Sequence, residues 1–166
     1  MKEDKKEGWY VTEESHDLFK AAQKDIITVN CLIKDTNFGF EEKVDSMCRN
    51  VTEAVEKMIK GWLRDYDPQL KVPKTHDLCK LYDILYEIDE AFVKIKNQIN
   101  SLNNYTTEFR YSSKFKIEDH EFRECLKNVK FVYDFELIKN TRDKMNEKNK
   151  FNVLPDDISA LFGEFS

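Results

Sequence analysis

Apolar residues recur three or four positions apart along most of the 166-residue chain, which is the spacing of one helix face. Only four glycines and three prolines interrupt the chain. Sheet proteins need more turn residues than that. The sequence therefore predicts an all-α protein of few, long helices. The clearest apolar stripe is formed by Val44, Cys48, Val51, Val55, Met58 and Trp62.

Four helical segments are predicted, and the loops between them are short or of medium length. The first segment runs from about Trp9 or Thr12 to Lys34. The second segment ends at Asp67-Pro68. The third covers Leu78 to Leu102, with Thr75 as its N-cap and a bend or break near Glu87 to Ala91. The fourth runs from about Glu118 to Lys148, and its polar last turns are expected to project or fray. An up-down antiparallel four-helix bundle is the expected architecture. Its core should include four aromatic residues at helical spacing: Trp62, Tyr82, Phe92 and Tyr133.

The C-terminal residues differ from the bundle. Their apolar side chains fall at helical spacing and follow a short acidic run, which predicts a short amphipathic helix that packs on its own bundle or meets a partner. We accordingly divide the chain into a helical bundle, residues 1–150, and a C-terminal amphipathic extension, residues 151–166. The residues that define this stripe are Leu154, Ile158, Leu161, Phe162 and Phe165.

A formal net charge of −5 provides no general attraction to nucleic acid or anionic lipid, and no DNA partner is expected. The apolar runs are too short to cross a bilayer, and residues 1–7 lack the apolar core of a signal peptide. We therefore expect a cytoplasmic protein without a membrane partner.

No metal site or cofactor is expected. The sequence has no His-x-x-Glu or Asp-x-Asp cluster and no glycine-rich loop for phosphates. The cysteines lie far apart without a C-x-x-C pair, which indicates buried free thiols on helices; a metal or redox site is the alternative. They are Cys31, Cys48, Cys79 and Cys125.

Four stretches, read in order, resemble the HEPN family, the higher eukaryotes and prokaryotes nucleotide-binding domain. Trp9 followed by Asp17-Leu18 and Ala21 is similar to the family's first helix, and Thr75-His76-Asp77-Leu78 with Leu81 to its third-helix start. Arg110-Tyr111 resembles the Arg-Tyr-Pro element, although Ser112 replaces the proline. The second-helix pattern, commonly Gln-Ala-x-Glu-Lys-x-x-Lys-x-x-Leu, resembles Glu53-Ala54-Val55-Glu56-Lys57-Met58-Ile59-Lys60-Gly61-Trp62-Leu63.

The resemblance implies a helical domain that usually forms homodimers. Family members include metal-independent ribonucleases, partners of small nucleotidyltransferases in toxin–antitoxin pairs, and proposed nucleotide binders. The nuclease motif is an arginine and a following histidine that are separated by four to six residues. The three histidines here, His16, His76 and His120, have no arginine at that spacing. Catalysis by the family mechanism is therefore not expected.

The resemblance also implies a binding site. In it Lys57, Lys60, His76 and Arg110 converge to hold a phosphate, and Tyr111 stacks on a base. The alternative for the second helix is a solvated Glu56–Lys60 pair at i and i+4. The alternative for His76 is a first-turn residue that satisfies backbone groups. His16 and His120 are expected to be solvated.

We therefore expect a non-catalytic HEPN-type binding or assembly module. Its expected ligand is a nucleotide, or its partner a small nucleotidyltransferase in a toxin–antitoxin-like pair. A divergent ribonuclease acting on RNA through His76 or His120 is one alternative. The other is a structural helical adaptor that uses residues 151–166.

Overall fold

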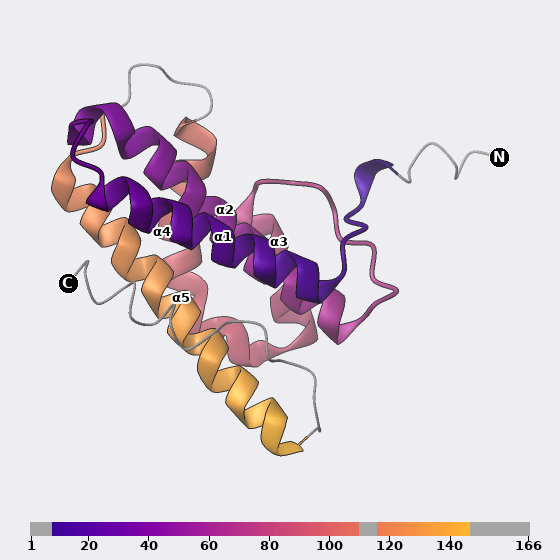
Figure 1. Cartoon of the computed structure of the whole chain (residues 1–166). Coiled ribbons are helices and arrows are strands. Elements are labelled where there is room, and N and C mark those ends of the chain that lie inside the picture. Colours follow the sequence, from indigo (N-terminus) through magenta and orange to yellow (C-terminus); the bar gives the residue numbers. More distant parts are fainter. Residues whose placement is uncertain (1–7, 110–115, 147–166) are drawn as a thin grey trace.

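The computed structural model describes the backbone of residues 8–109 and 116–146, and the side chains of residues 8–106 and 116–135. These residues form five α-helices and a six-residue 3₁₀ helix, with no strand beyond an isolated bridge (Figure 1). The predicted all-α bundle is thus confirmed. The elements are α1 (Ser15–Lys34), α2 (Phe40–Tyr66), α3 (Leu78–Ile88), η2 (Glu90–Ile95), α4 (Lys96–Phe109) and α5 (Asp119–Asn146).

Helix α2 is the central element, because it packs against α1, α3, α4 and α5. Its longest interface is with α1, which lies alongside it (Figure 1). The two helices are joined by a tight loop in which the Asp35 carboxylate accepts hydrogen bonds from the backbone N–H groups of Asn37 and Phe38. These bonds favour the ionised carboxylate and lower the pKa of Asp35 below its ordinary value.

Helix α1 begins at Ser15, so the predicted start at Trp9 or Thr12 was wrong. Before the helix, Tyr10 forms an antiparallel bridge with Pro73 in the linker before α3. Val11 N–H donates to the carbonyl of Val72 at 2.8 Å, and Lys74 N–H donates to the carbonyl of Trp9 at 2.8 Å. A backbone engaged in antiparallel pairing cannot continue a helix. The bridge fixes the linker that carries His76.

The N-cap of α3 is Asp77, whose carboxylate accepts from Lys80 N–H. The predicted cap, Thr75, was wrong; its hydroxyl instead accepts from Asp77 N–H at 3.1 Å. His76 consequently precedes the helix and does not lie in its first turn. The predicted break in the third segment is confirmed: α3 ends at Ile88, and η2 and α4 follow.

The predicted core aromatics are all buried: Trp62, Tyr82, Phe92 and Tyr133. Phe92 contacts the rings of Trp62 and Phe135, which joins η2 to α2 and α5. The fourth predicted helix corresponds to α5, whose C-terminal end extends past the other helices (Figure 1). Residues 147–166, including the predicted amphipathic extension, lie outside the described residues.

The cysteine prediction was correct for two of the four residues. Cys48 and Cys125 are buried, whereas Cys31 is exposed and Cys79 is partly exposed. A hydrogen bond with Cys48, together with burial, raises the pKa of the Cys125 thiol well above its usual range. None of the described helices is long and apolar enough to span a membrane.

Candidate functional site

The candidate site lies on the middle turns of α2, where Glu56, Lys57 and Lys60 point in two directions. Glu56 and Lys60 are four residues apart and share one helix face, whereas Lys57 is offset from Glu56 by about 100°. The first face meets the linker before α3, and Lys57 meets α1. The Glu56, Lys57 and Lys60 side chains of α2 therefore make two separate contacts, one with the linker before α3 and one with α1, and do not form a single cationic patch.

Glu56 and Lys60 form a buried ion pair. Lys60 Nζ lies 2.6 Å from Glu56 Oε1, and the two side chains are 9% and 7% exposed. The predicted solvated pair was therefore wrong. Because four helices surround α2, the polar face of its middle turns is covered, and charged groups there need a bonded partner.

His76 contacts the buried Glu56–Lys60 pair from the protein surface. Its Nδ1 lies 2.8 Å from the second carboxylate oxygen of Glu56, Oε2. A carboxylate accepts only, so Nδ1 carries the hydrogen when the ring is neutral. The His76 side chain is 54% exposed. Glu56 thus links a buried ammonium to an imidazole at the surface and fixes the tautomer of that imidazole.

Lys57 has a different partner, Asp25 of α1. Lys57 Nζ lies 2.6 Å from Asp25 Oδ2, and both groups are partly buried. Burial raises the pKa of Asp25 above its ordinary value, and the hydrogen bond from Lys57 opposes this increase. Each lysine of the predicted phosphate site is therefore paired with a carboxylate.

The structure describes three of the five residues of the predicted phosphate site: Lys57, Lys60 and His76. Lys60 and His76 meet through Glu56, while Lys57 lies on the neighbouring side of α2. Arg110 and Tyr111 lie outside the described residues. From the sequence, Glu56 is expected only as a partner of Lys60. Its contact with His76, twenty positions along the chain, was missed because a helical pattern reveals only neighbours three or four residues apart.

The other two histidines lie on the surface, as predicted. His16 is exposed in the first turn of α1. His120 is 74% exposed, and its Nδ1 lies 3.2 Å from an exposed Glu118 oxygen. Among the residues that the structure describes, no buried carboxylate orients either of them, in contrast to His76.

Comparison with known proteins agrees with the helical architecture. The model of the HEPN domain matches residues 15–141, which include all five α-helices up to residue 141 of α5. No curated protein and no solved structure shows significant similarity to the chain. A family match over well more than half of the 166 residues is sufficient to assign the family. The chain belongs to the HEPN domain family.

Proposed function

We propose that this HEPN domain is a non-catalytic binding and assembly module that presents His76 to a nucleotide. Family membership supports a nucleotide- or RNA-related role. The proposed setting is a homodimer that pairs with a small nucleotidyltransferase in a toxin–antitoxin-like system. The bundle, residues 1–150, carries this role, and residues 151–166 are an extension.

The observation that carries the proposal is the Lys60–Glu56–His76 chain of contacts. Only its imidazole end is open to solvent, because Lys60 and Glu56 are both buried. Lys60 thus acts on a ligand indirectly, by holding the carboxylate that orients His76. Lys57 lies beside this chain, and Arg110 and Tyr111 complete the proposed site as phosphate and base contacts.

The same geometry favours binding over cleavage. Cleaving RNA without a metal takes an acid–base group at the 2′-hydroxyl and a cation for the phosphate. The Lys60 ammonium is buried against Glu56, and the Lys57 ammonium is bonded to Asp25. Neither is presented as an uncompensated charge, whereas one oriented imidazole is sufficient to donate or accept a hydrogen bond.

Nucleotide titration followed by thermal melting tests the proposal. A ligand present at about 100 times its Kd adds about 2.7 kcal/mol, which raises the melting midpoint by about 5–10 °C for a domain of this size. AMP, ATP and inorganic phosphate should be compared. His76→Ala should remove the increase, and His120→Ala, at an exposed histidine without a buried partner, should retain it. If no nucleotide changes the midpoint, the nucleotide proposal is wrong.

The assembly part of the proposal needs its own measurement. Size-exclusion chromatography with light scattering should give the mass of a dimer. Co-expression with a small nucleotidyltransferase encoded beside this chain should give a stable complex. A monomer that forms no such complex would contradict this part and leave nucleotide binding as a separate result.

One contact favours the alternative of a divergent ribonuclease. Glu56 holds Nδ1 of His76 at 2.8 Å, much as a carboxylate orients the histidine of a catalytic triad, and leaves Nε2 as the nitrogen able to take a proton. RNA cleavage by the purified protein, lost in a folded His76→Ala variant, would replace the non-catalytic proposal with this one.

A further inference from the structure

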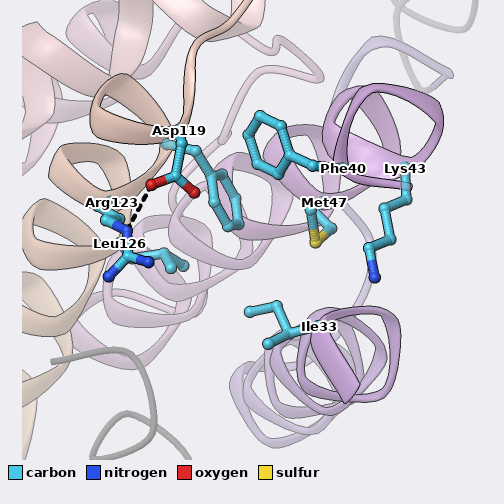
Figure 2. A pocket seen from close by; sticks show the side chains of 8 residues that line it. Ile33, Phe40, Lys43, Met47, Asp119, Arg123 and Leu126 are labelled. Carbon is cyan, nitrogen blue, oxygen red and sulfur yellow. Dashed lines mark hydrogen bonds and ion pairs between the residues drawn. The ribbon is translucent and has the colours of Figure 1, made fainter. Parts of the chain in front are cut away.

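A groove lies between α1 and α5, with α2 as its floor. Both outer helices pack on α2, and the side chains between them leave a cavity of about 270 Å³ (Figure 2). Its apolar lining comes from all three helices: Ile33 of α1, Phe40 and Met47 of α2, and Phe122 and Leu126 of α5. The groove is separate from the contacts of Glu56 and His76.

The edges of this groove carry two cations. Figure 2 shows Lys43 on one side and Arg123 on the other, with the apolar side chains between them. Lys43 donates to the Asp35 carbonyl at 2.7 Å, and Arg123 is bonded to the exposed carboxylate of Asp119. The lining itself holds two cations and one carboxylate, and the Asp35 carboxylate lies near enough to Lys43 to interact with it. An occupant with an apolar face and acidic flanks would complement this lining.

The shape and lining of the cavity suit the side chains of a helix. At about 270 Å³ it is close to the lower end of the usual size of small-molecule pockets, about 300–1,000 Å³. An apolar groove between helices is the kind of surface that an amphipathic helix covers with residues spaced by three and four.

The C-terminal residues 151–166 have the matching chemistry. Their apolar residues recur at helical spacing, and they contain three acidic residues and no lysine or arginine. The acidic residues are Asp156, Asp157 and Glu164. The segment is thus apolar on one face and negative overall, opposite in charge to the two cations at the edges of the groove.

The chain is long enough for this segment to return to the groove. Leu126 lies 20 residues before the end of α5, a distance of about 30 Å along the helix. Residues 147–153 span up to about 23 Å when extended, and a helix from 154 to 165 adds about 18 Å. Together they exceed the distance that must be covered.

We propose that the chain's own C-terminal segment, residues 151–166, docks as an amphipathic helix in the groove between α1, α2 and α5. Its apolar residues contact the partly exposed side chains of Ile33 and Phe40, and its acidic residues face Lys43 and Arg123. This intramolecular contact does not depend on the proposed nucleotide-binding function, because it uses no residue of that site.

Photo-crosslinking in the full-length chain tests the proposal. Benzoylphenylalanine replaces Phe162, the sample is irradiated, and peptide mass spectrometry locates the crosslink. We expect crosslinks within one chain to residues 33–47 or 119–126. The same probe at Ala160, about 200° around a helix from Phe162, should give few of these products. A crosslink to a second chain would overturn intramolecular docking and assign the groove to another copy. Crosslinks elsewhere, or none, would also overturn it.

Variants of the groove provide a second readout. Arg123→Glu reverses an exposed charge at the groove edge, and Ile33→Asp places a charge on its apolar wall. Ile33→Asp should lower the crosslink yield by about fivefold or more, and Arg123→Glu should lower it by about two- to fivefold. Arg49→Glu is the matched control, because Arg49 is exposed and lies about 200° around α2 from Met47. If Ile33→Asp does not fold, Arg123→Glu alone decides. An unchanged yield in Arg123→Glu would contradict docking in this groove.

Discussion

Removing Glu56 should destabilise the protein far more than removing an ordinary helix-surface charge. In Glu56→Ala, the Lys60 ammonium stays beneath the surface without its carboxylate, and His76 loses the acceptor of its Nδ1–H. Breaking a buried pair from one side costs about 3–5 kcal/mol, whereas an exposed i,i+4 pair contributes about 0.3–0.5 kcal/mol. We expect about 3 kcal/mol, because the flexible stem of Lys60 lets its ammonium move towards solvent.

Urea unfolding followed by far-UV circular dichroism measures this cost. With a slope of about 2 kcal/mol per molar urea, a loss of about 3 kcal/mol lowers the midpoint by about 1.5 M. Lys60→Ala should also destabilise, because it leaves the Glu56 carboxylate buried with only His76. The double variant should lose less than the sum of the two, since no unpaired charge is left.

The chain contains a matched control for burial. Asp119 and Arg123 also form an i,i+4 pair, with a similar N–O distance of 2.7 Å, but their side chains are 63% and 61% exposed. Apart from any loss of the proposed contact with residues 151–166, Arg123→Ala should therefore cost only a few tenths of a kcal/mol. Equal and small losses in Glu56→Ala and Arg123→Ala would refute the argument that burial makes the Glu56 pair important.

Three further predictions concern packing and pH. In Gly61→Ala, the new Cβ would lie 2.9 Å from the buried Phe19 ring, so overpacking of about 1–3 kcal/mol should outweigh a helix-propensity gain of about 1 kcal/mol. Urea unfolding should show a net loss that disappears in a Phe19→Leu background. Burial raises the pKa of Asp25, so the wild type should lose stability relative to Asp25→Asn as pH rises from 3.8 through the raised folded-state pKa. Asp35→Asn should behave oppositely in thermal melts, because the pKa of Asp35 is lowered and the wild type loses stability as pH falls below 3.8.

Helix positions and most of the core could be predicted because they depend on local periodicity. The aromatic residues expected in the core, such as Trp62 and Phe92, are buried, and the break after Ile88 lies within the predicted range. The errors occurred where distant segments pair. The start of α1 and the cap of α3 depend on the bridge between residues 9–11 and 72–74, and a helical pattern contains no information about that pairing.

The sequence by itself determined the helical class, the family and the placement of Glu56 and Lys60 on one helix face, because each depends on residues close together along the chain. Only the tertiary structure decided that this pair is buried, since burial requires α1, α3, α4 and α5 to surround α2. It also joined His76 to Glu56 across twenty residues, through a linker held by backbone pairing with the N-terminal segment. Spacing along a helix sets which side chains are neighbours, but the dielectric environment that gives a charged pair its energetic importance depends on what the rest of the chain places around it.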